Sequence, residues 1–413
     1  MNLEYFIARR LVTAKNYKSS ISAPIIKIAI VAIAIGIVMM IIAVATGVGL
    51  QEKIREKISA FNGHIIISNF DDNESEVSVE PISIKQDFYP EFTSAEGISH
   101  IQAVASKAGI IRTEEAFEGI VFKGVGKEYK WDVIQEYLVD GRLPNLKASL
   151  NSEVLLSKYL ADRLKLKVGD KFNTFFMKEG GNGMPNLRRF EIVGIYTSGF
   201  QEFDATYVLG DIRHVQRINK WKEGQVGSFE VFIDNFDKID EKGKEVYNSD
   251  AVPSTLNTRT ITEKYFNIFE WLKLFDINIV VIITIMVVVA TINMVVALLV
   301  LILERTQMVG ILKAVGAANW SIRKIFLYNA AYLIIKGLLW GNIAGIGLLL
   351  IQKYFEVIKL PPENYYVTVA PVVIDIPAIL IINIGTVLVC ITLLLIPSYI
   401  ITKISPVRVL RFD

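Results

Sequence analysis

Cysteine is almost absent from this sequence of 413 residues, which contains Cys390 and no second cysteine. A single cysteine excludes an intramolecular disulfide framework and a metal site built from several thiolates. The three histidines, His64, His100 and His214, lie far apart, so no spacing predicts a zinc site. Charge of either sign is not in excess, because 44 Lys and Arg residues balance 42 Asp and Glu residues to a net charge of +2. We therefore expect no nucleic-acid partner.

Motifs for nucleotide binding and hydrolysis are missing as well. Gly126-Lys127 resembles part of a phosphate-binding loop, but Val121 stands where its first glycine belongs and Glu128 where Ser or Thr is needed. No GxSxG sequence and no paired carboxylate motif stands out. Carboxylate counts alone leave a glycosidase or a protease open. The sequence nevertheless gives no positive sign of catalysis, and we expect no metal or cofactor bound by this chain.

Long apolar runs are what the sequence does contain, since 52% of its residues are hydrophobic and only 21% are charged. A helix needs about 20 apolar residues to cross a bilayer. Four segments satisfy this requirement, and we predict transmembrane helices at 28–49, 276–303, 325–351 and 376–401. The third carries Lys336 near its middle, which has to snorkel, pair with a polar group or face a cavity.

The first apolar segment admits a second interpretation as a cleaved signal peptide. Ala43-Val44-Ala45 superficially fits a small-residue cleavage site. However, 27 residues precede the apolar run, and the run exceeds the usual core of about 7–15 residues. We therefore favour an uncleaved membrane anchor.

Positive charges around the four segments predict the orientation of the chain, since loops rich in Lys and Arg stay in the cytoplasm. Such charges gather before the first segment, between the second and third, and after the fourth. Both termini are therefore expected in the cytoplasm of a multi-pass membrane protein. The remaining predicted segments are a cytoplasmic amphipathic N-terminal segment at 1–27, a large domain on the far side of the membrane at 50–275, a cytoplasmic helix at 304–324, a short loop on the far side at 352–375 and a cytoplasmic tail at 402–413.

The 50–275 segment is long enough for its own core and is bounded by two predicted stalk helices. The first stalk continues the first span, with Leu50, Ile54, Ile58 and Phe61 on one face. Its charged residues Glu52, Lys53, Arg55, Glu56 and Lys57 are expected to face elsewhere. The second stalk begins at a capping box of Thr260 and Glu263, followed by Tyr265, Phe269 and Leu272 on one face. Ordinary amphipathic core helices are the alternative.

Between the stalks, strand and helix patterns alternate without a repeat, which predicts an α+β domain. We predict strands at 64–67, 119–125, 171–177, 190–196 and 229–233, helices at 153–164, 212–221 and 238–248, and an exposed acidic loop at 71–80. A glycine-rich connection, 177–189, joins two of the strands and has the composition of a binding loop or of a plain surface loop.

Two features of the membrane part invite a functional interpretation. Gly337, Gly341 and Gly345 recur every four residues, a stripe that lets another helix approach closely and serves packing more often than transport. In the 304–324 loop, an apolar stripe of Met308, Ile311, Leu312 and Val315 at helical spacing predicts a short helix that fits a groove on a cytoplasmic partner. A solvated turn between two spans is the alternative.

The 304–324 loop resembles the coupling element of the FtsX/MacB-type ABC permease superfamily, which docks on an ATPase subunit. The matching residues are Glu304, Arg305, Val309, Gly310, Ile311, Leu312, Lys313, Ala314, Val315, Gly316 and Ala317. Met308 replaces the acidic residue that is usual at this position of the motif, so a salt bridge with the ATPase is not expected at position 308. The layout of four spans with the large domain between the first two is also similar.

Within the superfamily, the chain resembles the lipoprotein-releasing permeases of the LolC/LolE type. The resemblance rests on Phe6-Ile-Ala-Arg-Arg-Leu11, Ser20-Ile-Ser22, Phe61-Asn-Gly-His64, Gly141-Arg-Leu-Pro144, Ser152-Glu-Val-Leu-Leu156, Leu166-Lys-Val-Gly-Asp170, Phe190-Glu-Ile-Val-Gly194 and Ser405-Pro-Val-Arg-Val-Leu-Arg411. It implies a non-catalytic permease of the bacterial inner membrane, with both termini in the cytoplasm and with the 50–275 domain and the 352–375 loop in the periplasm. Such a permease pairs with a second permease copy, itself or a related chain, and with a cytoplasmic ABC ATPase dimer that binds the ATP and Mg.

The same resemblance implies a cargo and a second partner. Lipoproteins destined for the outer membrane would be passed from the inner membrane to a periplasmic lipoprotein carrier, and Met184, Pro185 and Leu187 are candidates for the contact with that carrier. Within the superfamily, a MacB-like permease for efflux by mechanotransmission is the alternative. An FtsX-like regulator of cell-wall hydrolases is a third possibility, although its outer domain tends to be much smaller.

Overall fold

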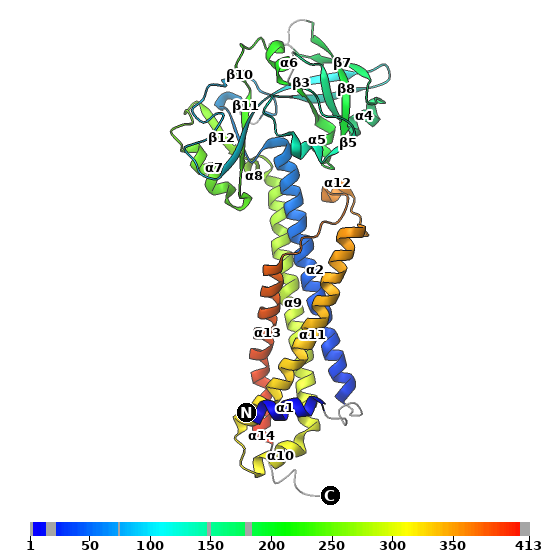
Figure 1. Ribbon diagram of the computed structural model, residues 1–413, viewed down its shortest axis with the longest axis vertical. Coiled ribbons are helices and arrows are strands. Elements are labelled where there is room, and N and C mark those ends of the chain that lie inside the picture. The colour runs from blue at the N-terminus through cyan, green and yellow to red at the C-terminus, as the bar shows by residue number, and fades with distance from the viewer. Residues whose placement is uncertain (1–2, 14–21, 73–74, 147–149, 178–183, 405–413) are drawn as a thin grey trace. The chain divides into compact units, whose positions relative to one another are not determined.

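The computed structural model describes residues 3–13, 22–72, 75–146, 150–177 and 184–404 (Figure 1). The chain divides into two compact units. The first, which we call the helical unit, consists of Met1–Gln51, Trp271–Lys359 and Val369–Asp413. The second, the sheet unit, consists of Glu52–Glu270 and Leu360–Thr368. The segments 14–21 and 405–411, which carry part of the resemblance, lie outside the described residues.

Long helices dominate the helical unit, and two of them continue into residues of the sheet unit. The helices are α1 (Leu3–Thr13), α2 (Ser22–Asn62), α9 (Phe266–Glu304), α10 (Thr306–Ala314), α11 (Asn319–Phe355), α13 (Ile376–Ser398) and α14 (Ile400–Lys403). Among the described residues, four helical stretches are long and apolar enough to cross a membrane: Pro24–Asn62, Phe266–Glu304, Asn319–Phe355 and Ile376–Lys403. The predicted four-helix membrane part is therefore confirmed.

The helices begin and end outside the predicted spans. α2 starts at Ser22 and runs to Asn62, and α9 starts at Phe266, well before the predicted boundary at 276. Hydropathy marks only the apolar part of each helix, whereas the backbone hydrogen bonding continues through the amphipathic stalk.

Polar contacts also hold the spans of the helical unit together. The side-chain amides of Asn342 in α11 and Asn383 in α13 exchange two hydrogen bonds, at 2.7 and 3.0 Å. In an apolar surrounding such a pair satisfies groups that would otherwise lack partners, and is worth about 1 kcal/mol. On the same helix α11, the ring of Tyr328 meets Tyr5 of α1 edge-on at 6.0 Å between ring centroids.

The sheet unit has one large mixed sheet. Its strands are β1 (Ile65–Asn69), β3 (Ile98–Arg112), β4 (Phe117–Val125), β5 (Leu138–Gly141), β6 (Glu153–Ser157), β7 (Lys171–Phe176), β8 (Asn186–Tyr196), β9 (Tyr207–Asp211), β11 (Ser228–Ile233) and β12 (Leu256–Thr260). A separate pair is formed by β2 (Ile82–Ser83) and β10 (Gln225–Val226). The short helices are α3 (Trp131–Gln135), α4 (Lys158–Leu164), α5 (Gln201–Thr206), α6 (Ile212–Ile218), α7 (Ile239–Tyr247), α8 (Ile261–Lys264) and α12 (Pro362–Tyr365).

Six strands of this sheet close into a ring. Strand β3 pairs with β4, and the pairing continues through β9, β6, β8 and β7 back to β3. In such a ring alternate residues point inward. Phe122, Phe176 and Phe190 form the aromatic contacts of the interior, with Phe122 stacked on Phe190 at 4.9 Å between centroids. Strands β11, β1 and β12 extend the sheet in that order from β3, and β5 pairs with β8.

Several predicted elements of the α+β domain are present, and two predictions are wrong. The five predicted strands correspond to β1, β4, β7, β8 and β11. The predicted helix at 153–164 is wrong in its first half, because Glu153–Ser157 forms β6. The acidic loop at 71–80 is not simply exposed, because Asp72 and Ser78 are buried. The Asp72 carboxylate accepts hydrogen bonds from the backbone N–H groups of Val79 and Glu80.

The stalk predictions hold with one exception. Leu50, Ile54, Ile58 and Phe61 are buried as expected. The capping box of Thr260 and Glu263 is formed in both directions. Lys57, expected to face away from the apolar stripe, is buried, with its Nζ 3.0 Å from the carbonyl oxygen of Tyr366. Burial lowers the pKa of Lys57 to about 8.

The connection between the third and fourth spans belongs to the sheet unit. Residues Leu360–Thr368 group with that unit, and the ring of Tyr366 stacks on Phe200 at 4.6 Å between centroids. Asp204 fixes the backbone before Phe200 by accepting from the N–H groups of Ser198 and Gly199. The predicted short loop 352–375 is therefore a docked segment of the sheet unit over its central residues.

Candidate functional site

The 304–324 segment, predicted as one coupling helix, consists of α10, a turn and the first residues of α11. Gly316 makes the turn at φ +92°, a left-handed conformation that favours glycine. The N–H of Gly316 donates to the carbonyl of Lys313 at 3.0 Å, and that of Ala317 to the carbonyl of Leu312 at 2.9 Å. These two bonds form the Schellman motif that ends a helix. The prediction of a single helix is therefore wrong, because Gly316 divides it.

The apolar residues of α10 lie on two faces. Val309 and Gly310 are buried, while Met308 and Leu312 pack half-buried against the core of the helical unit. Ile311 and Val315 lie on the other face, 49% and 83% exposed, and Trp320 at the start of α11 is 50% exposed. We call Ile311, Val315 and Trp320 the exposed apolar patch. The stripe expected as one partner-binding face is therefore divided between the core and the surface.

The charged residues of this segment also differ in their surroundings. Lys313 directs its ammonium into the helical unit, where it donates to the carbonyls of Ile401 at 2.7 Å, Thr402 at 3.2 Å and Ile404 at 2.8 Å. A cation at this position satisfies carbonyls that a helix end leaves without partners. Arg305 is the residue before the first turn of α10, and Glu304, the last residue of α9, is exposed. Lys313 therefore holds the end of α14, whereas Glu304 remains accessible.

The glycine stripe of α11 lies against α2. A β-carbon on Gly337 would come within 2.6 Å of the Ile33 side chain, and one on Gly341 within 2.7 Å of Ile37 and 2.9 Å of the Ala34 carbonyl oxygen. At Gly345 the nearest atom, on Ile41, is at 3.3 Å. The stripe therefore permits a close approach of two helices. Lys336, beside the stripe, is exposed and lies 4.5 Å from the centroid of the Tyr332 ring.

The hairpin between β7 and β8 carries the three candidate carrier contacts. Residues 178–183 of the connection lie outside the described part of the chain. Met184 is 86% exposed, Leu187 is 50% exposed and Pro185 is exposed. Strand register places Leu187 opposite Phe175, and Phe175 opposite Ile110, in one row on the outer side of the ring. The hairpin residues thus continue into an apolar surface that includes the exposed Ile110 on β3.

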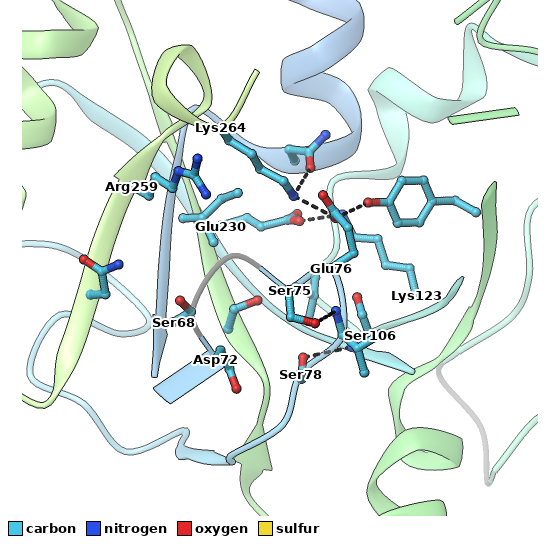
Figure 2. A pocket seen from close by; sticks show the side chains of 17 residues that line it. Ser68, Asp72, Ser75, Glu76, Ser78, Ser106, Lys123, Glu230, Arg259 and Lys264 are labelled. Atoms are coloured by element: carbon cyan, nitrogen blue, oxygen red, sulfur yellow. Dashed lines mark hydrogen bonds and ion pairs between the residues drawn. The ribbon is translucent and has the colours of Figure 1, made fainter. Parts of the chain in front are cut away.

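A polar pocket opens in the sheet unit where the two stalks meet the sheet (Figure 2). Its wall contains Asn62 from the end of α2, Lys264 from α8, Lys123 from β4 and Glu230 from β11. Figure 2 shows Lys264 and Glu76 pointing toward one another at one side of the pocket, with Ser75, Ser78 and Ser106 at another. No group of three or more His, Cys, Asp or Glu side chains suited to a metal occurs among the residues that the structure describes.

Two ion pairs organise this pocket. Lys123 Nζ lies 2.5 Å from Glu230 Oε1, and both side chains are about 5% exposed or less. Gln102 Nε2 donates to the other oxygen of Glu230 at 2.8 Å. Lys264 Nζ lies 2.9 Å from Glu76 Oε2, which also accepts from the hydroxyl of Tyr207 at 2.5 Å.

Burial and charge act against each other on the titratable groups of the pocket. Burial lowers the pKa of Lys123, and the Glu230 carboxylate opposes that shift. Burial by itself would raise the pKa of Glu76, but Lys264 and the Tyr207 hydroxyl bring it below its usual value. The pocket therefore keeps the Lys123–Glu230 pair desolvated, whereas in the second pair the side chain of Glu76 is 40% exposed. No sequence motif predicted this cluster. A lysine at position 123 within the apolar run 120–125 was a signal that could have indicated a buried charge.

Four membrane-spanning helices with a large mixed-sheet domain inserted between the first two define a multi-pass membrane protein with a periplasmic-type domain. A model of the FtsX-like permease C-terminal domain matches residues 280–406, and a model of the MacB-like periplasmic core domain matches residues 28–240. The second match covers more than half of the chain. The chain therefore belongs to the FtsX-like permease family with a MacB-like periplasmic core domain, as the resemblance predicted.

Two relatives that align with most of the chain indicate which permeases it is similar to. The chain is 22% identical to the lipoprotein-releasing system transmembrane protein LolC of Xylella fastidiosa, over 100% of this chain and 99% of that protein. It is 21% identical to the lipoprotein-releasing system transmembrane protein LolE of Haemophilus influenzae, over 84% of this chain and 82% of that protein. A solved extracellular domain of the ABC-type transporter YknZ from Gram-positive bacteria aligns with 48% of this chain and 100% of that chain, at 17% identity and a TM-score of 0.33.

Proposed function

We propose that this chain is the permease subunit of an ABC complex that releases outer-membrane lipoproteins from the inner membrane to a periplasmic carrier. The observation that carries the proposal is the similarity to the lipoprotein-releasing protein LolC along the whole of both chains. The matches to both family models are consistent with it. In this proposal ATP and Mg are bound and used by a separate cytoplasmic ATPase dimer.

The physical reason for an ATPase partner is the cost of removing acyl chains from a bilayer. Each buried CH₂ group stabilises a lipid anchor by about 0.8 kcal/mol, so a multiply acylated protein does not leave spontaneously. The sequence has no nucleotide-binding motif of its own. A second permease copy, itself or a related chain, would complete a complex with two ATPase subunits.

The orientation follows from the distribution of positive charge. We propose that α1, the 304–324 segment and the C-terminal tail lie in the cytoplasm, and that the sheet unit lies in the periplasm. The turn between α10 and α11 then faces the ATPase. Within the described part of the chain, Ile311, Val315 and Trp320 are each about half exposed or more, and apolar side chains exposed in this way suit a groove on a partner. Glu304, Arg305, Met308, Gly310, Leu312, Lys313 and Gly316 shape and orient this surface.

We further propose that the carrier binds at Met184, Pro185 and Leu187. These side chains are exposed, and they continue into the row of Phe175 and Ile110. Exposed apolar side chains at a hairpin next to a rigid ring provide an anchor for a partner with an apolar surface.

Depletion of the chain from its own bacterium tests the proposal. We expect lipoproteins that carry an outer-membrane sorting signal to accumulate in the inner-membrane fraction. Re-expression of the wild-type chain should restore sorting, while a chain with Ile311→Asp should not. Normal lipoprotein sorting after depletion would contradict the proposal and favour an efflux or signalling permease.

A further inference from the structure

Asn62 joins the two stalks next to the sheet, within the sheet unit. It is the last residue of α2. Its Oδ1 accepts hydrogen bonds from Lys264 Nζ at 3.1 Å and from the Tyr265 hydroxyl at 3.1 Å. Its Nδ2 donates to the carbonyl of Ile58, one turn earlier, at 3.2 Å. Because Lys264 ends α8 and Tyr265 lies between α8 and α9, a single side-chain amide fastens the end of the first stalk to the start of the second.

Lys123 joins the end of α2 to the sheet. Its ammonium donates to the carbonyl of Phe61, next to Asn62, and to Glu230. Lys123 comes from β4 and Glu230 from β11, and Gln102 from β3, between these two strands, holds the second oxygen of Glu230. The carbonyl end of α2 is thereby attached to three adjacent strands. A cation is favoured there because the last carbonyls of a helix carry partial negative charge.

The backbone that follows Asn62 is closely packed against β11. Gly63, which ends α2 at φ +68°, would place a β-carbon 2.9 Å from the Glu230 side chain. His64 then enters the sheet with its N–H bonded to the carbonyl of Val231 at 2.8 Å. The change from helix to strand is completed within two residues, so a displacement of the end of α2 must displace β11 or break these bonds.

A buried ion pair such as that of Lys123 and Glu230 contributes little net stability compared with apolar side chains of the same size, but it tolerates little change in geometry. We propose that Asn62 and the Lys123–Glu230 pair are positioning residues that transmit stalk movement to the sheet unit. This inference rests on the proposed function, since it assigns the residues through which ATP-driven movement of the spans reaches the periplasmic domain. Their role is transmission, and it is separable from the folding of the unit.

Matched substitutions of Asn62 test the first contact. Asn62→Asp keeps the oxygen acceptors for Lys264 and Tyr265, whereas Asn62→Ala removes them. Both variants are assembled with the ATPase in proteoliposomes, and lipoprotein transferred to the carrier is measured per ATP hydrolysed. We expect Asn62→Ala to lower this ratio by at least about fivefold with the ATPase rate kept, and Asn62→Asp to stay near wild type. An unchanged ratio in Asn62→Ala would overturn the inference.

The ion pair is tested by replacing both partners at once. Lys123→Met with Glu230→Met removes the two charges together, and such replacements commonly leave stability unchanged or higher. We expect this double variant to form the complex, to hydrolyse ATP and to release little lipoprotein. Release per ATP at the wild-type level in this variant would overturn the inference. If the double variant does not assemble with the ATPase, the comparison of Asn62→Ala with Asn62→Asp decides whether these residues transmit the movement.

Hydrogen exchange separates failure of the inference from failure of the proposed function. In the wild-type complex, ATP binding should change exchange in α2 and also in β4 and β11. In Asn62→Ala the change in α2 should remain and the change in the strands should disappear. Persistence of the strand response in Asn62→Ala would overturn the inference alone. A wild-type complex that responds to ATP in this way but releases no lipoprotein would overturn the proposed cargo and leave the joint in place.

Discussion

The ammonium of Lys313 lies 2.7 Å from the carbonyl oxygen of Ile401, so the segment between the second and third spans is bonded to the end of the fourth. Arg323 makes a second connection of this kind, with Nε 3.0 Å from the Ser398 hydroxyl and an Nη atom 2.8 Å from the Leu395 carbonyl oxygen. Residues on both sides of the turn between α10 and α11 are therefore hydrogen-bonded to the end of α13 and to α14.

Substitution of the exposed apolar patch should separate partner binding from folding. Ile311→Asp or Val315→Asp places a charge where we expect an apolar contact with the ATPase, which should weaken co-purification of the ATPase by about tenfold or more. The melting temperature of the isolated chain should not change, since both side chains point away from the core. Gln307→Glu, an exposed change on the same helix, is the control. Full ATPase recovery with Val315→Asp would refute this docking surface.

Lys313→Met should lower the stability of the chain and leave binding of the ATPase unchanged. Loss of the ammonium removes a donor from three carbonyls at the end of α14, of which that of Ile401 keeps the N–H of Ile404, and should lower the free energy of unfolding by about 1–2 kcal/mol. Thermal unfolding in mild detergent measures the effect, with the exposed Lys353→Met as a control for the loss of a charge. If Lys313→Met reduces ATPase binding at unchanged stability, the ammonium contacts the partner and the structural role assigned here is incorrect.

The glycine stripe predicts a graded response to alanine. Gly341→Ala forces a β-carbon against Ile37 and the Ala34 carbonyl, so α2 and α11 must separate, at a cost of about 1–3 kcal/mol. Gly345→Ala should cost less, because its nearest neighbour is 3.3 Å away. Gly347 on the same helix has nothing within 4 Å of its virtual β-carbon, and Gly347→Ala should leave stability unchanged or raise it slightly. Equal melting temperatures for Gly341→Ala and Gly347→Ala would disprove the close packing.

His64 should make the protein less stable in mild acid. Burial lowers the pKa of His64 to about 4, and its Nδ1 accepts from the N–H of Ile233 at 2.9 Å, so the folded protein holds the neutral ring. The unfolded chain takes up a proton below its ordinary pKa of about 6.5. Stability from this residue is therefore complete above that pH and is lost as the pH falls toward 4, by about 2–3 kcal/mol in total.

The variant His64→Asn isolates this contribution, because an amide oxygen can accept the same backbone hydrogen bond without titrating. Melting temperatures of both proteins are compared at pH 7 and pH 4.5. We expect the wild type to lose more stability than the variant between the two values. Parallel pH profiles would show that His64 does not hold its neutral form in the folded protein.

Local patterns in the sequence predicted those parts of the fold that depend on neighbouring residues. The capping box of Thr260 and Glu263 was visible because both partners are three residues apart. The buried face of the first stalk was visible because Leu50, Ile54 and Ile58 recur at helical spacing. The strand 153–157 was mistaken for helix because its apolar run, Val154-Leu155-Leu156, fits a buried strand and a buried helix equally well.

Contacts between distant residues decided the features that the sequence did not predict. Lys123 and Glu230 are 107 positions apart, and only the pairing of β4, β3 and β11 brings them together. The motif of the 304–324 segment identified the residues there, yet it could not show that Lys313 faces inward while Ile311 and Val315 face outward. That difference depends on where α14 ends, which no pattern within the segment contains.

Reconstitution provides the most direct test of the central claim. The purified chain is placed in liposomes with its ATPase, a triacylated lipoprotein and a soluble carrier, and carrier-bound lipoprotein is measured with and without ATP. The account predicts release that requires ATP, the ATPase and this chain together, and no ATP hydrolysis by this chain alone. Release of equal extent from liposomes that contain the ATPase but lack this chain would contradict the account.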